Sequence, residues 1–164
     1  MGVACGSTLV AVLTNPPLTD GKRTLNRVAL AADLLGFGEF VVANLFALPS
    51  QSTAAIGKLG ASGKGWVAAR EPLEAGLAVA GGVLLAYGAT PPSGPARVHF
   101  RDQVAWLRER VDVLSRPVWV VGDGPRHPSR WQRWTHRVHP DLSFRDALRL
   151  SLAPVQPNSV GGAG

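Results

Sequence analysis

Apolar segments alternate with amphipathic segments along most of this chain, and this alternation constrains the fold more than any other feature of the sequence. Four short apolar runs have the length and composition of strands buried in a sheet: Thr8–Leu13, Phe40–Leu45, Gly82–Tyr87 and Val118–Val121. Strands that alternate with helices are joined by right-handed crossovers and lie parallel to one another. The sequence therefore predicts an α/β fold with a four-stranded, mostly parallel sheet.

Helical periodicity fills the segments between and after these runs. The predicted helices are Thr24–Leu35, a helix within Trp66–Ala80 that begins near Glu71, Arg97–Leu114, and a last one near Ser143–Leu152. The connection from Ser50 to Gly65 is rich in Gly and Ser, which predicts a mobile loop. Residues 153–164 show no periodicity and predict a disordered C-terminal tail, so residues 1–152 form the single predicted domain.

The composition is that of one globular domain, since 46% of the 164 residues are hydrophobic and 17% are charged. The single cysteine, Cys5, excludes intramolecular disulfides and favours the reducing cytoplasm. The most apolar stretch, Gly76–Ala89, is shorter than the roughly 20 residues that a membrane-spanning helix needs. We therefore expect a cytoplasmic monomer with no membrane partner.

Basic residues exceed acidic ones, 17 Lys and Arg against 11 Asp and Glu, and the resulting net charge of +6 favours a polyanionic partner. Four arginines recur at spacings of four, three and four residues: Arg126, Arg130, Arg133 and Arg137. On a helix they would share one face, opposite an apolar face of Trp131, Trp134 and Val138. Two interpretations stay open: a solvated helix face, or a helix that contacts nucleic-acid phosphates.

Polar side chains follow the predicted strands at the points where a parallel sheet binds its ligands. Asn15 lies between the first strand and Pro16, where it would either close an Asx turn or point into a pocket with a stiff proline wall. Asn44 lies in an apolar strand, where an unsatisfied carboxamide costs a few kcal/mol. Backbone groups or the edge of a ligand would satisfy it, and both alternatives stay open.

His127 is closely flanked by prolines in the segment that leaves the fourth predicted strand, so its backbone has a fixed direction. We expect it to bind substrate or to act in catalysis, with Asp123 as a candidate partner for its second ring nitrogen. Ser129 is a candidate cap for the next helix. His127, His136 and His139 lack an accompanying Cys or Glu pattern, and no nucleotide-cofactor fingerprint is present. We therefore predict neither a metal nor a cofactor.

Four segments, taken together, resemble the pattern of the bacterial and phage domain-of-unknown-function family 1643. They are Asn15–Pro16, Asn44–Leu48, Ala86–Ala89 and Gly124–Pro128. Their order and spacing match from about Thr8 to Ser129. The chain departs from that pattern at Pro17, Lys22, Arg23 and Pro49. The family implies no settled activity.

The same strand ends are similar, more distantly, to the uracil-DNA glycosylase superfamily. Its strands end in an Asp-Pro or Asn-Pro motif, a base-reading Asn, a strand ending in Trp-Gly, and a His-Pro-Ser motif. Asn15–Pro16, Asn44, Val83–Ala89 and His127–Ser129 occupy those places in that order, with Asn rather than Asp at the first motif. The resemblance implies a three-layer α/β sandwich. It also implies hydrolysis of the N-glycosidic bond of a modified or damaged base flipped from nucleic acid.

The resemblance further implies a role for each site residue. Asn15 and His127 would be catalytic: Asn15 would position water, and His127 would stabilise the negative charge on the departing base. The substrate would be bound by Pro16, Asn44, Gly88 and Ser129, with Asn44 reading the Watson-Crick edge. The nucleic-acid backbone would be held by Arg126, Arg130, Trp131, Arg133 and Arg137, with Trp131 also able to wedge into the base stack.

Two other function classes stay open. A non-catalytic nucleotide or nucleic-acid binding protein on the same fold would suit Asn15 in place of a catalytic Asp. A partner-binding protein would use exposed Trp131 and Trp134. Oligonucleotide binding separates the last class from the other two, and release of free base separates those two from each other.

Overall fold

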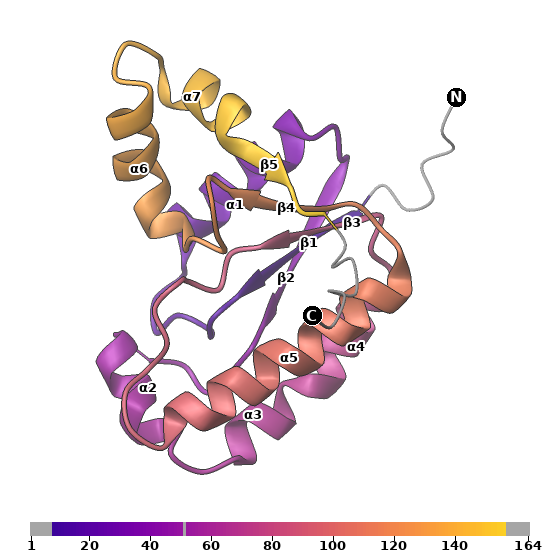
Figure 1. Cartoon of the computed structure of the whole chain (residues 1–164), viewed down its shortest axis with the longest axis vertical. Coiled ribbons are helices and arrows are strands. Elements are labelled where there is room, and N and C mark those ends of the chain that lie inside the picture. The colour runs from indigo at the N-terminus through magenta and orange to yellow at the C-terminus, as the bar shows by residue number, and fades with distance from the viewer. Residues whose placement is uncertain (1–7, 51, 157–164) are drawn as a thin grey trace, which may run out of the picture.

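Five strands form one sheet in the computed structural model, which describes residues 8–50 and 52–156 (Figure 1). The strands are β1 (Thr8–Leu13), β2 (Glu39–Asn44), β3 (Gly82–Leu85), β4 (Val118–Val121) and β5 (Leu152–Pro154). Their spatial order is β2-β1-β3-β4-β5. Strands β1 to β4 run parallel, and β5 pairs antiparallel with β4. The predicted α/β class and the parallel arrangement of the four apolar runs are confirmed.

Strand β5 corrects two predictions. The sheet is mixed and has five strands rather than four. Ala153 and Pro154, which were predicted to begin a disordered tail, pair with β4. A strand of three residues is too short for alternation along the sequence to reveal it. The remainder of the predicted tail, residues 157–164, and Cys5 lie outside the described residues.

Helices cover both faces of the sheet. They are α1 (Lys22–Leu34), α2 (Thr53–Leu59), α3 (Lys64–Ala68), α4 (Arg70–Ala78), α5 (Ala96–Leu114), α6 (Trp131–Val138) and α7 (Phe144–Ser151), with a 3-10 turn, η1 (Pro128–Arg130), directly before α6. Helices α1, α6 and α7 pack on one face, and α3, α4 and α5 pack on the other (Figure 1). The molecule therefore has three layers, with the sheet in the middle.

The connection from Ser50 to Gly65, which the composition predicts to be a loop, contains α2 and the start of α3. The Ser52 side chain accepts a hydrogen bond from the backbone N–H of Ala55 and caps α2. Gly65 lies so close to Phe46 that a Cβ atom would stand 2.3 Å from the ring. This glycine serves close packing, which composition does not distinguish from flexibility.

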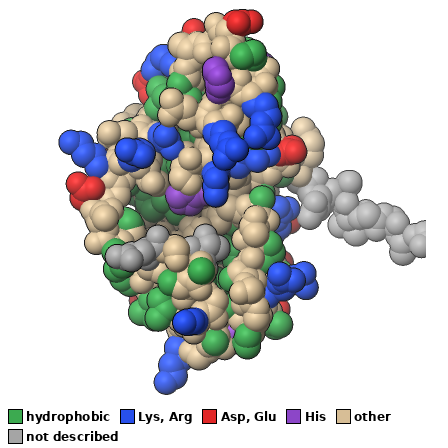
Figure 2. Space-filling view, turned by 90° about the vertical axis from the view of Figure 1, so that its left-hand side faces the viewer, with side chains coloured by type: hydrophobic (Ala, Val, Ile, Leu, Met, Phe, Trp, Pro, Cys, Tyr) green, Lys and Arg blue, Asp and Glu red, His purple; other side chains and the backbone are tan. Residues whose placement is uncertain are grey.

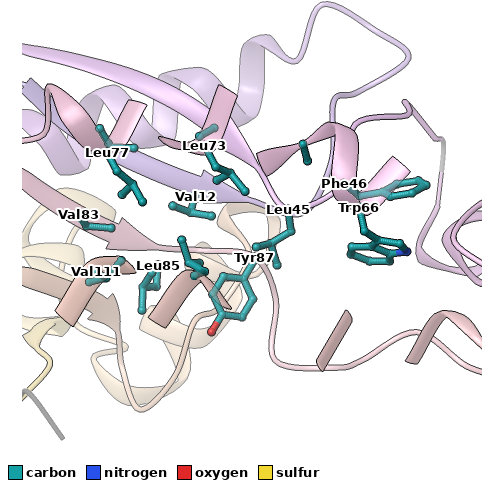
Figure 3. Close-up of a cluster of buried hydrophobic side chains, with 14 of the residues drawn as sticks. Val12, Leu45, Phe46, Trp66, Leu73, Leu77, Val83, Leu85, Tyr87 and Val111 are labelled. Atoms are coloured by element: carbon teal, nitrogen blue, oxygen red, sulfur yellow. The ribbon is translucent and has the colours of Figure 1, made fainter. Parts of the chain in front are cut away.

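Two apolar cores hold the layers together. Figure 3 shows part of the first, in which Val12, Val83 and Leu85 of the sheet pack with Leu73 and Leu77 of α4. The second core lies on the opposite face, where side chains of β1 and β3 pack against α1, α6 and α7. Each large apolar side chain that is fully buried stabilises the fold by roughly 1.5 to 3 kcal/mol. The central strands are thus anchored on both faces.

The strand order reverses at β1, since β2 lies on one side of it and β3 on the other. The helix that follows β1 packs on one face of the sheet, and the helices that follow β2 pack on the other face. In open parallel sheets such a reversal leaves a crevice beyond the carboxyl ends of the strands. The fold therefore indicates a ligand site beyond the ends of β1 and β3.

Candidate functional site

A cavity of about 860 Å³ opens beyond the carboxyl ends of β1 to β4. Its lining includes ten of the predicted site residues: Asn15, Pro16, Asn44, Gly88, Arg126, His127, Ser129, Arg130, Arg133 and Arg137. Figure 2 shows a group of Lys and Arg side chains on this side of the molecule. The predicted convergence of the polar residues from four strand ends on one cavity is confirmed.

Asn15 bridges two loops at the cavity wall. Its Nδ2 donates hydrogen bonds to the backbone oxygen of Leu48, at 3.1 Å, and to Oγ of Ser50, at 2.7 Å. The side-chain amide therefore holds the segment after β2 against the segment after β1, instead of closing an Asx turn of its own. Oδ1 of Asn15 makes no hydrogen bond within the described part of the chain, and it is the atom left to bind a ligand or water.

Asn44 is the last residue of β2, and its side chain lines the cavity. Its Oδ1 atom is buried and has no hydrogen-bond partner among the described residues. A buried polar atom without a partner costs about 1 to 3 kcal/mol. Of the two alternatives open from the sequence, satisfaction of this oxygen by the backbone does not occur within residues 8–50 and 52–156. A ligand that presents an N–H or O–H donor would satisfy it.

His127 has one ring nitrogen engaged within its own turn. Its Nδ1 accepts a hydrogen bond from the backbone N–H of Ser129 at 3.1 Å and lies 2.9 Å from Oγ of the same residue. Because a backbone N–H only donates, the neutral ring carries its proton on Nε2. Burial lowers the pKa of His127, and the positive charges of Arg130 and Arg27 lower it further. The site therefore contains a neutral imidazole with an Nε2–H donor.

Two details around His127 correct the sequence predictions. Asp123 forms an ion pair with Arg126 instead of a hydrogen bond with His127. Ser129 does not cap a helix, because it lies inside η1, and the cap of that turn is the side chain of His127. Pro128 occupies the first position of η1, as proline commonly does, and this places the cap on the preceding residue.

Hydrogen bonds tie the strand ends around the cavity to one another. Oγ1 of Thr14, directly after β1, donates to the backbone oxygen of Tyr87 at 2.6 Å. The N–H of Gly88 donates to the backbone oxygen of Pro125, also at 2.6 Å. Gly88 has a φ of +89°, a conformation that glycine adopts without strain. These bonds join the segments that follow β1, β3 and β4 into one floor.

One wall of the cavity is a basic surface made of Arg126, Arg130, Arg133 and Arg137, which we call the arginine wall. Arg126 is held by Asp123 and stacks on the Trp134 ring at 5.0 Å, and its buried Nε has no hydrogen-bond partner in the part of the chain that the structure describes. The guanidinium groups of Arg130, Arg133 and Arg137 form no ion pair or hydrogen bond with any described residue. Three unpaired cations thus face the cavity.

Trp131 does not belong to this wall. It is 0% exposed in the second core, and its Nε1 donates to the backbone oxygen of Arg126 at 2.8 Å. It can neither wedge into a base stack nor present a partner surface, so both predictions for it are wrong. Trp134 is partly buried against the second core and also lines the cavity, so the predicted apolar face is confirmed for Trp131 and Trp134. It is wrong for Val138, which is 47% exposed, whereas Thr135 is buried, a position that apolar periodicity does not reveal.

The cavity lining also contains polar residues that the sequence reasoning missed: Thr14, Asp20, Thr24, Ser50 and Tyr87. Asp20 is the one acidic residue among the described residues that line it, and its Oδ1 accepts a hydrogen bond from the backbone N–H of Lys22 at 3.1 Å. Thr14 lies directly after a predicted strand, so its position was a usable signal. Asp20 lies in a turn seven residues beyond β1, and no spacing pattern marks it.

In comparisons with known proteins, no family model, no curated protein and no solved structure matches the chain. Within residues 8–50 and 52–156, no group of three or more His, Cys, Asp or Glu side chains is placed to hold a metal ion. The same residues contain no helix that is both long and apolar enough to cross a membrane.

Proposed function

We propose that this protein binds nucleic acid and hydrolyses the N-glycosidic bond of an unpaired base held in the cavity. The observation that carries the proposal is the pair of unused hydrogen-bonding groups in one cavity, an orphaned acceptor on Asn44 and an Nε2–H donor on His127. The edge of a nucleobase presents both a donor and an acceptor. The arginine wall beside these groups suits the phosphates to which such a base is attached.

Each group has a defined part in the proposed reaction. Oδ1 of Asn44 accepts a hydrogen bond from a ring N–H or an amino group of the base. Nε2 of His127 donates to a base oxygen that gains negative charge as the bond between C1′ and the base nitrogen breaks. Asn15 Oδ1 orients a water molecule. The water oxygen bonds to C1′, the C1′–N bond breaks, and the base leaves with its electron pair and takes up the proton that the water loses.

The neutral state of His127 supports its role as a donor that is ready before the reaction begins. A donor aimed at developing negative charge in a site of this kind contributes about 10²- to 10³-fold in rate. Ser129 fixes the ring by donating to Nδ1, so the two residues act as one unit. Pro16 and Gly88 contribute wall and floor against which a flat base can lie.

A non-catalytic reader of bases is the second candidate function. It is favoured by the hydrogen bonding of Asn15, whose Nδ2 is occupied by Leu48 and Ser50. It is also favoured by the scarcity of carboxylates that could act as a general base. Asp20 is the one carboxylate among the described lining residues, and its Oδ1 accepts a hydrogen bond from the backbone of its own turn. The same pocket would then bind a base without cleaving its bond to the sugar.

The test is to incubate the protein with single-stranded oligonucleotides that carry deaminated or otherwise modified bases, and to measure free base and abasic sites. We expect release by the wild type, and a loss of about 10²-fold or more in His127→Ala. His136→Ala, an exposed histidine of α6 outside the cavity, is the control and should keep full activity. Binding without release of any base would favour the reader, and no binding at all would overturn both functions.

A further inference from the structure

A second, open groove of about 600 Å³ lies beside the cavity, between α1 and the first residue of α7. Lys22, Arg23 and Arg27 provide its charge, and Leu30 and Phe144 provide its apolar floor. Asp20 lines both the cavity and the groove, so the two spaces adjoin. We propose that this groove binds the nucleotide next to the one held in the cavity, within a single-stranded nucleic acid. This inference rests on the proposed function.

The positive charge of the groove exceeds the negative charge that the described residues supply there. Lys22 and Arg23 are exposed on the first turn of α1, and their side chains make no ion pair within the described part of the chain. Asp20 is the acidic residue of the groove, so one negative charge stands against the three positive charges of Lys22, Arg23 and Arg27. An anion is therefore the ligand that complements this surface.

Arg27 connects the groove to the turn that holds His127. Its Nη1 donates to the backbone oxygen of Pro128 at 2.8 Å, and its Nη2 donates to Oε1 of Gln132 at 3.1 Å. Pro128 directly follows His127, so Arg27 stands between the cavity and the groove. The same guanidinium lies 5.9 Å from the centroid of the Phe144 ring. Helix α1 is thereby held at a fixed position relative to His127.

The basic groups of the two spaces are close enough to act on one another. Burial and the neighbouring charge of Arg23 lower the pKa of Arg27. The charges of Arg27 and Arg130 contribute in turn to the lowered pKa of His127. Positive charge thus continues from the arginine wall, past His127, to the start of α1. A phosphodiester backbone that follows this course would relieve the repulsion among these cations.

A single strand fits this arrangement better than a duplex. The base in the cavity must be unpaired, because its hydrogen-bonding edge is the edge that Asn44 and His127 contact in the proposed function. The groove combines cations with an aromatic side chain, which is the usual combination in sites for single-stranded nucleic acid. A flanking base can therefore rest on Leu30 and Phe144 while its phosphate meets Lys22 and Arg23.

The test measures how tightly the wild type and its variants bind a fluorescent single-stranded 12-mer, by fluorescence anisotropy over a series of salt concentrations. In Lys22→Ala/Arg23→Ala we expect affinity to fall about 10-fold at low salt. The slope of log affinity against log salt is negative and should become shallower by about 1.4, since each lost phosphate contact contributes about 0.7 to its magnitude for single strands. Arg101→Ala/Arg108→Ala removes two exposed cations from α5, outside both spaces, and should bind like the wild type.

The outcomes separate the groove from the proposed function. If Lys22→Ala/Arg23→Ala binds like the wild type while Arg130→Ala/Arg133→Ala binds weakly, the groove proposal is overturned and the proposed function stands. If the corresponding duplex binds as tightly as the single strand, the assignment to a single strand is overturned. If the wild type binds no oligonucleotide at low salt, the proposed function itself fails. The substituted residues are exposed, so the variants are expected to fold.

Discussion

Asn15, Asn44 and His127 line the same cavity but differ in how far their hydrogen-bonding groups are already used. The amide nitrogen of Asn15 is shared between two acceptors, whereas Oδ1 of Asn44 is buried without a partner. His127 uses one ring nitrogen in its own turn. Only unused groups can exchange water for a ligand without breaking the fold. Asn44 and His127 are therefore the residues whose substitution should affect ligand binding more than stability.

The lowered pKa of His127 makes the stability of the protein depend on pH. As the pH falls, the unfolded chain binds this proton before the folded protein does, so protonation favours unfolding. The contribution of the neutral ring is complete above the ordinary histidine value of about 6.5, and it is lost as the pH falls from there through the lower pKa of the folded protein. We expect the melting temperature of the wild type to fall over this window more steeply than that of His127→Gln.

The measurement is a series of thermal melts of both proteins from pH 8 to pH 5. The acidic residues titrate alike in the two proteins, so the difference between the two curves isolates the histidine. A constant difference across the whole range would show that the folded state does not hold this ring neutral.

Gly122 adopts a φ of +78°, and a Cβ atom there would lie 2.6 Å from the Trp134 ring. Gly122→Ala should therefore destabilise the protein by about 2 to 4 kcal/mol, through backbone strain and the displacement of Trp134 from the cavity wall. Gly124, two residues away, has no heavy atom within 4 Å of such a Cβ atom. Gly124→Ala is therefore the control, and urea denaturation of both variants compares their stability. Equal midpoints would contradict the close approach of Trp134 to Gly122.

At the scale of elements, uniformly apolar strands and long amphipathic helices were predictable, whereas the shortest elements were not. Strand β1 was predicted at its observed bounds, and the predicted helix Arg97–Leu114 differs by one residue from α5. Periodicity needs several repeats to stand out from chance, and β5 and α3 are too short to provide them. The start of α6 was missed for another reason, since the arginine spacing continues through the η1 turn without a break.

The arginine wall belongs to this scale, because its effect depends on several residues of η1 and α6 acting together. Arg130→Ala/Arg133→Ala should make the negative slope of log affinity against log salt shallower by about 1.4 on single-stranded oligonucleotides. Neither residue has a partner within the described part of the chain, so the melting temperature should stay within about 2 °C of the wild type. An unchanged slope would mean that this helix face contacts only solvent.

At the scale of the whole molecule, the position of the site was predictable but its internal bonding was not. Parallel strands bring their carboxyl ends to one edge, so residues far apart in sequence could be assigned to one cavity. The burial of Trp131 and the adjoining groove depend on how helices pack, which a single sequence does not specify. The basic groove at α1 draws residues from three segments and left no pattern in any of them.

Strand β5 closes one side of the sheet, so its removal should affect the molecule as a whole. A chain that ends at Ser151 leaves the hydrogen-bonding groups of β4 open to solvent and to other strands. The loss of roughly 2 kcal/mol should lower the melting temperature by about 4 to 8 °C, and light scattering should detect self-association. A chain that ends at Gln156 keeps β5 and serves as the control. Identical behaviour of both truncated chains would rule out a structural role for this strand.

Because Thr14 and Gly88 tie the strand-end segments together, the floor of the cavity has its shape before any ligand arrives. A ligand that enters has little backbone motion to arrest, so the entropy lost on association is small. The same rigidity limits adaptation to poorly fitting molecules. The cavity would then select its ligands by their shape and hydrogen-bonding groups as they enter. A crystal of the free protein should accept small fragments by soaking without rearrangement of its lattice.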